Sequence, residues 1–228
     1  PEIEICWLAC EPASKAIEDA GETLLPESDQ WANENIYLEK SADGEFTSNL
    51  SKYLTSVSGN WHQNVRLFER VTEKEAFDLI IADEAYEISI AIRKKRDQVK
   101  APFVMIYDFV GVDAMTWKPL EKLVAYVFNK KTAGNRKFYS DSRNAAFFVG
   151  EPEDIPDKSL GPFLPNRREM AQKSYHFLGY VLHFDPEKYA DVKRSKEKLG
   201  YDDSPLIVCS IGGTAVGKDL LNLCGRAF

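Results

Sequence analysis

The sequence predicts an α/β fold built on a mainly parallel sheet with helices on both faces. Short segments rich in β-branched and aromatic residues alternate along the chain with stretches of helical periodicity. The strand segments are apolar at nearly every position, as in parallel strands that are covered on both sides. Prolines or acids precede several helical stretches, and glycines follow them. Together these patterns are typical of a Rossmann-like sheet.

The first half of the chain supplies three predicted strands and three predicted helical regions. Pro12 suits the first turn of a helix, and Gly21 suits its end. The cations of residues 93–96 suit the last turn of another helix, where the helix dipole favours positive charge. The predicted strands span residues 3–9, 78–82 and 102–107, and residues 23–26 form a short extended piece. The predicted helices span residues 11–20, 46–76 and 84–96, and the second of them is broken near residues 58–60. Residues 28–44 are predicted to be a loop.

The second half continues the alternation. Residues 112–137 are predicted to be partly helical, and the proline-rich residues 151–165 form a loop. Asp185 can cap a helix that runs to Leu199 and stops at Gly200. The remaining predicted strands span residues 145–150, 177–181 and 205–211, and the last of them enters a glycine-rich turn and a helix.

Composition and charge narrow the class of protein. The 228 residues are 44% hydrophobic and 29% charged, which suits one large globular domain or one domain plus part of another. The net charge of −7 is opposite to the overall positive charge that is typical of nucleic-acid-binding proteins. No apolar run reaches the roughly 18–20 residues that span a bilayer. Four cysteines match no zinc-ligand spacing and are expected to be free thiols in a reducing cytoplasm.

Both ends of the sequence lead us to expect a fragment of a longer protein. The chain starts with Pro1 rather than Met and enters a predicted strand almost at once. At the other end, residues 220–228 begin a helix that has a continuous apolar side. Because no later residues are present to cover this side, we expect truncation at both ends.

The glycine-rich turn after residue 211 has the clearest chemistry. Glycines let the backbone approach a phosphate closely, and the N–H groups at a helix start attract anions. A P-loop would fit Gly212, Gly217 and Lys218, but Asp219 stands where that motif needs Ser or Thr to bind magnesium. Two alternatives are a diphosphate-binding turn of a second Rossmann-like half and a plain turn that binds nothing.

This turn also carries a family resemblance. The segment Leu206–Leu221, LIVCSIGGTAVGKDLL, resembles the opening of the C-terminal domain of GT-B glycosyltransferases, in particular the MurG-like and family-28 enzymes. Earlier segments resemble the N-terminal domain of that family in their order along the chain, so that the resemblance covers nearly all of it. These segments are residues 7–28, 77–95, 101–111, 147–156 and 177–186.

The resemblance implies a division into three parts. Residues 1–180 would form an acceptor-binding domain that lacks its first strand. Residues 181–204 would link it to residues 205–228, the start of a truncated nucleotide-sugar-binding domain. In the family a glycine-rich loop after the first strand, often containing Gly-His, commonly contacts the acceptor and in many inverting members supplies the catalytic base; that loop would precede Pro1. We therefore expect this fragment alone to be inactive.

The resemblance also implies an activity. The enzyme would be a Leloir-type hexosyltransferase that moves a sugar from a nucleotide diphosphate donor, expected to be UDP-linked, to an acceptor hydroxyl. The N–H groups of Gly212 and Gly213 and the hydroxyl of Thr214 would hold the donor phosphates, Gly217 would complete the turn, and Lys218 would add charge. No cofactor or bound metal is required, and the Asp-x-Asp signature of the other large glycosyltransferase fold does not occur.

Two other classes of function stay open. A non-catalytic α/β binding module would use the glycine turn only as structure. A P-loop-type phosphotransferase would bind ATP with magnesium and is disfavoured by Asp219.

Acidic residues follow two predicted strands. Asp83 and Glu84 come directly after strand 78–82, and Asp108 comes after strand 102–107. Ligands of open parallel sheets collect outside the carboxyl ends of the strands, so these acids are candidates to orient an acceptor hydroxyl or to act as a general base. The alternative is that Asp83 caps the next helix and Glu84 occupies its first turn.

Residues 117–137 mix large apolar side chains with lysines and arginine, and hold one acid, Glu121. Such a segment can lie on an anionic membrane, which would suit a lipid-linked acceptor and a place at the cytoplasmic face. The alternative is an ordinary surface helix that packs one face on the core.

Overall fold

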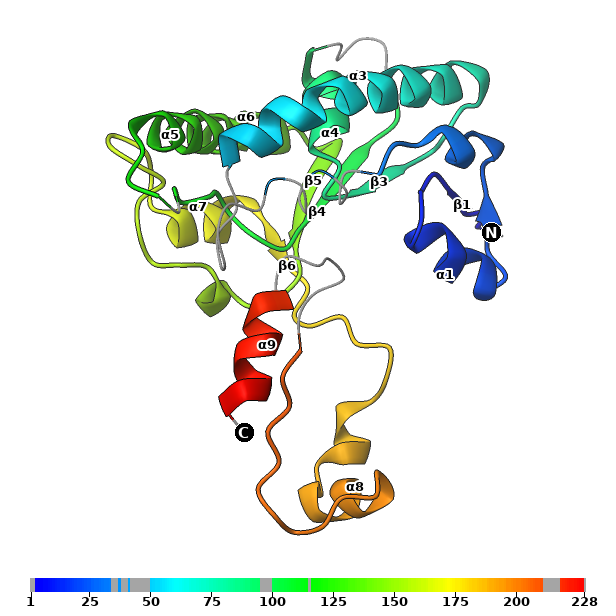
Figure 1. The fold of residues 1–228 in the computed structure, drawn as a ribbon. Helices are drawn as coiled ribbons and strands as arrows, with labels where there is room; N and C mark the ends of the chain where they lie inside the picture. Colours follow the sequence, from blue (N-terminus) through cyan, green and yellow to red (C-terminus); the bar gives the residue numbers. More distant parts are fainter. Residues whose placement is uncertain are drawn as a thin grey trace.

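The structure is a computed structural model that describes residues 3–33, 37, 41, 50–94, 100–114, 116–210 and 218–227, apart from the side chains of Leu50, Ser51, Ser58 and Lys218. It has an α/β architecture with two parallel sheets (Figure 1). The small sheet pairs β1 (Cys6–Trp7) with β2 (Thr23–Leu24). The larger sheet consists of β3 (Ile80–Asp83), β4 (Phe103–Tyr107), β5 (Asn144–Phe148) and β6 (His176–Phe177).

The larger sheet has the order β3-β4-β5-β6, and each pair is parallel. Helix α4 (Tyr86–Lys94) connects β3 to β4, and α7 (Arg167–Ser174) connects β5 to β6. Helices α5 (Pro119–Gly134) and α6 (Arg136–Tyr139) connect β4 to β5. Because the strands follow one another in a single direction, right-handed crossovers place these helices on one face of the sheet.

The core lies on that one face. It contains Phe103, Met105 and Tyr107 from β4, together with side chains from α3, α4, α6 and α7. On the opposite face Val104 is only half-buried, and Ile81 of β3 is exposed. The predicted α/β class with a parallel sheet is therefore confirmed, but the predicted cover of helices on both faces is wrong for the described residues, because the sequential strand order sends every crossover to the same side.

Helix α3 (Leu50–Lys74) is continuous, so the predicted break at residues 58–60 is wrong. Gly59 costs a helix interior about 1 kcal/mol relative to alanine. Burial of Val57, Leu67 and Phe68 along the same helix outweighs that cost, since each such side chain contributes roughly 1.5–3 kcal/mol.

The N-terminal unit is smaller than predicted. The strand expected over residues 3–9 is reduced to β1, and the helix α1 (Ala13–Asp19) is followed by Gly21 at φ +77°, as expected for a helix stop. The apolar side of α1 is not buried, since Ile17 is half-buried and Ala16 is exposed. A 3-10 helix, η1 (Pro26–Gln30), follows β2 within the stretch predicted as loop.

The C-terminal region differs from its prediction in two places. The single helix expected after Asp185 is divided into η3 (Pro186–Tyr189) and α8 (Val192–Lys198), because Asp191 caps a new helix by accepting a bond from the Arg194 N–H at 3.0 Å. Residues 205–210 form no strand, since no described strand lies beside them to complete a ladder. Helix α9 (Lys218–Ala227) follows as predicted.

Candidate functional site

The register of β3 and β4 brings the three predicted acids to one edge of the sheet. Asp83 is the last residue of β3 and pairs with Ile106 of β4. The Glu84 N–H donates to the Ile106 carbonyl at 3.1 Å, and Asp108 lies two residues beyond Ile106. Asp83, Glu84 and Asp108, here called the carboxylate cluster, therefore share the carboxyl end of the sheet, as the sequence predicted.

The backbone at Glu84 is unusual. Its φ of +51° lies in the left-handed region, which non-glycine residues enter at a cost of roughly 1–2 kcal/mol. The Tyr86 N–H donates to the Glu84 carbonyl at 2.8 Å and closes a tight turn between β3 and α4. Since α4 begins at Tyr86, Asp83 is not its N-cap residue and Glu84 is not in its first turn. Strained backbone of this kind gathers at functional sites.

The carboxylate cluster retains a proton near neutral pH. Burial, a hydrogen bond with Asp108 and the charge of Asp108 raise the pKa of Glu84 to about 8. Burial and the charge of Asp108 also raise the pKa of Asp83. Glu84 is the least exposed of the three, whereas Asp83 is covered only in part by its neighbours and Asp108 is exposed. The proton is therefore held mainly on Glu84, which two neighbouring carboxylates surround.

Tyr86 supports the cluster and was missed by sequence reasoning. Its hydroxyl donates to Oε1 of Glu84 at 3.0 Å, which favours the ionised form and partly offsets the rise in the pKa of Glu84. Burial raises the pKa of Tyr86 itself, so its hydroxyl stays protonated and serves as a donor. The sequence signal that could have indicated this contact is the position of Tyr86, two residues after the acid Glu84 at the end of a predicted strand.

An aromatic group lies behind Tyr86. The Tyr86 ring lies 6.0 Å from the Tyr107 ring and 5.7 Å from the Phe109 ring, measured between centroids. Tyr107 stacks on Tyr175 with centroids 5.0 Å apart, and its hydroxyl is 2.6 Å from that of Tyr139. This apolar wall is one source of the burial that raises the pKa of Glu84.

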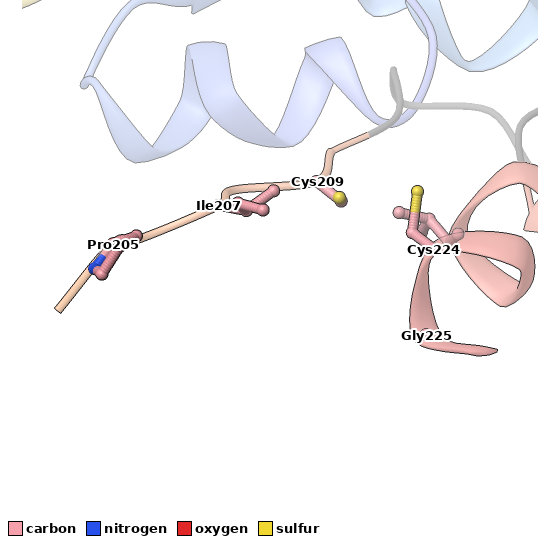
Figure 2. A pocket seen from close by; sticks show the side chains of 6 residues that line it. Pro205, Ile207, Cys209, Cys224 and Gly225 are labelled. Atoms are coloured by element: carbon pink, nitrogen blue, oxygen red, sulfur yellow. The ribbon is translucent and has the colours of Figure 1, made fainter. Parts of the chain in front are cut away.

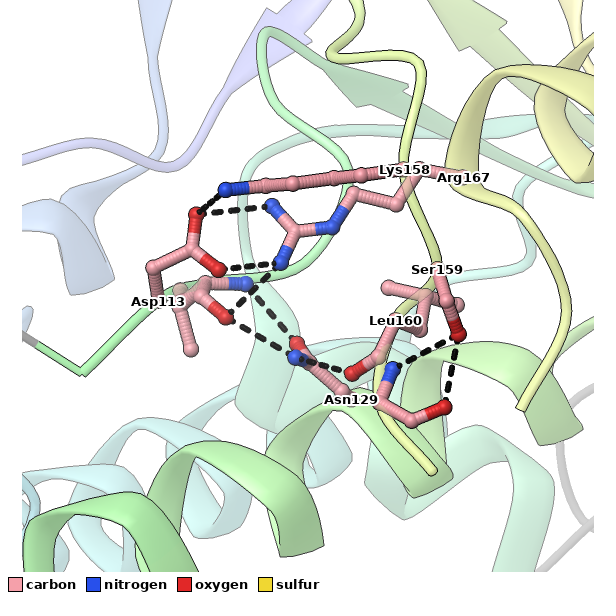
Figure 3. Close-up of polar contacts among 8 residues, drawn as sticks. Asp113, Asn129, Lys158, Ser159, Leu160 and Arg167 are labelled. Atoms are coloured by element: carbon pink, nitrogen blue, oxygen red, sulfur yellow. Dashed lines mark hydrogen bonds and ion pairs between the residues drawn. The ribbon is translucent and has the colours of Figure 1, made fainter. Parts of the chain in front are cut away.

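The loop that follows Asp108 is fixed by an ion-pair cluster of Asp113, Lys158 and Arg167 (Figure 3). Arg167, buried on α7, contacts Oδ1 of Asp113 at 2.7 Å, and Lys158 contacts Oδ2 at 2.6 Å. Burial alone would raise the pKa of Asp113, but hydrogen bonds from Lys158 and Arg167 hold that pKa below its usual range. This carboxylate is therefore ionised and structural.

Asn129 on α5 adds a second tie to the same loop (Figure 3). Its side chain accepts from the Val112 N–H and donates to the Val112 carbonyl, both at 2.8 Å, and donates to the Leu160 carbonyl at 2.7 Å. Gly111, at φ +72°, leaves no room for a side chain, since a Cβ there would lie 2.3 Å from Leu160. The backbone just beyond Asp108 is thus held in one position.

The predicted donor turn is not placed by this structure. Gly212, Gly213, Thr214 and Gly217 lie outside the described residues, as does the side chain of Lys218. The segments on either side of the turn enclose a hollow of about 470 Å³ (Figure 2). It is lined by Pro205, Ile207, Cys209, Leu221, Cys224 and Gly225. This lining is apolar with two thiols, and it supplies packing surface more than donors for a phosphate.

The Cys209 and Cys224 thiols face each other across this hollow (Figure 2). Their hydrogen bond raises the pKa of the Cys209 thiol, and both cysteines are free. Among the residues that the structure describes, no group of three or more His, Cys, Asp or Glu side chains is arranged to hold a metal ion. None of the described helices is both long and apolar enough to cross a bilayer.

Comparison of the chain with protein-family models, with curated proteins and with solved structures gives no significant match. The carboxylate cluster and the sequence of the glycine turn are therefore the features of this chain that bear on its function.

Proposed function

We propose that this chain provides the acceptor side, and the first donor-binding turn, of a glycosyltransferase that uses a nucleotide diphosphate sugar, with UDP as the expected nucleotide. The observation that carries the proposal is the carboxylate cluster. It places a carboxyl group with a pKa of about 8 at the end of a parallel sheet where ligands collect.

Glu84 is the group with the properties of a general base. Such a base works best when its pKa lies near the working pH, and roughly one Glu84 in ten is ionised at pH 7 if its pKa is about 8. Its carboxylate would take the proton of the acceptor hydroxyl as the oxygen bonds to the sugar and the bond to the leaving diphosphate breaks. Asp108 would share the proton, and Asp83 would orient the hydroxyl.

The donor side of the proposal is drawn from the sequence. The N–H groups of Gly212 and Gly213, with the Thr214 hydroxyl, would stabilise the charge that develops on the leaving diphosphate. Gly217 and Lys218 at the start of α9 would extend the same positive field.

UDP binding to the full-length protein tests the donor side. We expect saturable binding in isothermal titration calorimetry that is lost in Gly213→Asp, because the new carboxylate repels the diphosphate. Gly134→Ala is the matched control, since a Cβ at Gly134 meets open space. Absence of UDP binding would favour a non-catalytic module. Binding of ATP with magnesium that Lys218→Ala abolishes would favour a P-loop enzyme.

Carbon-detected NMR of carboxyl-labelled protein tests the acceptor side independently. We expect one glutamate resonance to titrate near pH 8 in the unmodified chain and to be missing in Glu84→Gln. In Asp108→Asn the same resonance should titrate at a lower pH, because a neighbouring negative charge has been removed. A Glu84 resonance that titrates near pH 4.5 in the unmodified chain would refute its assignment as the base.

A further inference from the structure

Helix α5 leaves a row of large aliphatic side chains exposed, which is unusual for a surface helix. Its buried side carries three polar residues, Glu121, Asn129 and Thr132, and the small Ala125. On the opposite side Leu120 is 63% exposed, Leu123 58% and Val127 44%, and Trp117 just before the helix is 89% exposed. The spacing of the three aliphatic residues by three and four places them on one face. A surface helix normally buries that apolar face.

Polar partners explain why the other side turns inward. Glu121 accepts a bond from the Thr116 N–H at 3.2 Å and another from the Thr116 hydroxyl. Asn129 binds the Val112 and Leu160 backbone. The tertiary structure thus uses polar side chains of α5 to fix two loops, while Leu120, Leu123 and Val127 stay exposed. The helix itself lies at the edge of the structure (Figure 1).

The charges beside this apolar face have one sign. Lys122, Lys130 and Lys131 are exposed, and the Lys122 Nζ lies 4.3 Å from the centre of the Trp117 ring. The only acid between residues 117 and 137 is Glu121, which is 2% exposed. The face is therefore cationic although the whole chain has a net charge of −7.

A neighbouring loop presents a second apolar side chain to solvent. Phe163 is 105% exposed and has a φ of +62°, a conformation that is strained for an aromatic residue. The Leu164 N–H donates to the Gly161 carbonyl at 3.0 Å, and the Ser159 hydroxyl contacts both the Gly161 and Leu164 carbonyls. The turn that carries Phe163 is thus closed by its own hydrogen bonds.

This turn is attached to α5. Asn129 donates to the Leu160 carbonyl at 2.7 Å (Figure 3), and Gly161 packs so closely on Tyr126 that a Cβ there would lie 3.0 Å from its ring. The turn that carries Phe163 is therefore fixed against α5 through Asn129 and Tyr126. Among the residues that the structure describes, none covers Phe163 or the row of aliphatic side chains on α5, since all of them are exposed.

We propose that the outward face of α5, together with Phe163, docks this protein on the surface of an anionic lipid bilayer. The membrane face comprises Trp117, Leu120, Leu123, Val127 and Phe163 with Lys122, Lys130 and Lys131. Its apolar side chains enter the boundary between headgroups and acyl chains, and its lysines bind the lipid phosphates. This inference stands apart from the proposed transferase activity, since it uses neither the carboxylate cluster nor the donor turn.

The lysines of the membrane face favour a lipid bilayer over a protein as its binding partner. The cores of protein–protein interfaces are depleted in lysine, whereas lysine and tryptophan side by side are characteristic of helices that lie in a membrane interface. A single aromatic side chain on a rigid turn is also suited to insertion between lipids, because the bilayer needs no matching pocket.

Sedimentation with vesicles tests the proposal. We expect the chain to bind vesicles of one part phosphatidylserine to three parts phosphatidylcholine, to leave vesicles of phosphatidylcholine alone, and to be released by high salt. Leu123→Asp and the double variant Lys130→Glu with Lys131→Glu should each weaken binding about tenfold or more. Lys15→Glu, an exposed change on α1, is the matched control and should bind as the unmodified chain does.

Phe163→Gly separates docking from folding. Glycine accepts a positive φ, so this variant should fold at least as well as the unmodified chain and yet bind the vesicles about threefold or more weakly. Failure of the unmodified chain to bind anionic vesicles, or unchanged binding by both Leu123→Asp and Phe163→Gly, would overturn the proposal. A dimer in sedimentation velocity that Leu123→Asp dissociates would also overturn it and assign the face to a second copy.

Discussion

Asp108 and Asp113 lie five residues apart in one loop, yet they belong to clusters of opposite character. Asp108 faces Glu84 and Asp83, and its charge raises the pKa of both. Asp113 faces Lys158 and Arg167, whose hydrogen bonds lower its own pKa. The difference is one of partners, because Asp108 and Asp113 are both exposed aspartates of the same loop.

The comparison distinguishes a structural acid from a chemically poised one. An acid that is paired with cations stays ionised and holds the backbone in place. An acid that faces other acids keeps a proton and can exchange it near neutral pH. The first arrangement supports the second here, since the ion-pair cluster fixes the loop that begins at Asp108.

The largest expected effect comes from removing the buried cation of the ion-pair cluster. Arg167→Met should lower the free energy of unfolding by about 2–4 kcal/mol, because the Asp113 contacts and the bond to the Val112 carbonyl are lost. Urea denaturation at pH 7 measures this. Lys173→Met, an exposed change on the same helix, is the control and should shift stability by less than about 0.5 kcal/mol.

Asn129→Ala should follow in size. It removes three hydrogen bonds to the Val112 and Leu160 backbone and should cost about 2–3 kcal/mol by the same measurement. If the loop positions Asp108, the pKa of Glu84 measured by NMR should also fall in this variant. An unchanged Glu84 titration would show that the two clusters are independent.

Glu84→Gln should stabilise the protein in alkaline solution only. Because the pKa of Glu84 is raised to about 8 on folding, the folded state binds more protons than the unfolded state between about pH 4.5 and 8, and stability falls as pH rises through that window. Glutamine does not ionise, so the variant does not lose this stability as pH rises. The variant should therefore gain about 1–3 kcal/mol at pH 8.5, allowing for solvent screening, and almost nothing at pH 4. Glu18→Gln on the exposed side of α1 should show no such pH-dependent gain.

Asp113→Asn should show the opposite pH dependence and the smallest effect. The pKa of Asp113 is lowered on folding, so its contribution is present above about pH 4 and is lost as pH falls below that value. The side chain is about half exposed, so the cost at pH 7 should be about 0.5–1 kcal/mol. A cost that persisted unchanged at pH 2.5 would contradict the assignment of Asp113 as an ionised partner.

Much of the secondary structure and the position of the carboxylate cluster could be predicted from the sequence. Strand β4 is an unbroken apolar segment, and acids directly after neighbouring parallel strands must meet at one edge. Helix α7 was missed, since its sequence of arginines and a glutamate has no apolar stripe, and it is held by Met170, Ala171 and buried Arg167. Tyr86 was missed as a partner because a side-chain hydrogen bond depends on a turn at Glu84 that no pattern indicates.

The sequence by itself determined the α/β class, the parallel strands and the set of acids that follow them, because short-range patterns of apolar and capping residues fix local structure. Only the tertiary structure decided which acids face cations and which face one another, that helices cover a single face of the larger sheet, and that α5 turns its apolar side outward. These outcomes depend on contacts between residues that are far apart in the chain, and such contacts leave no periodic signal in the sequence.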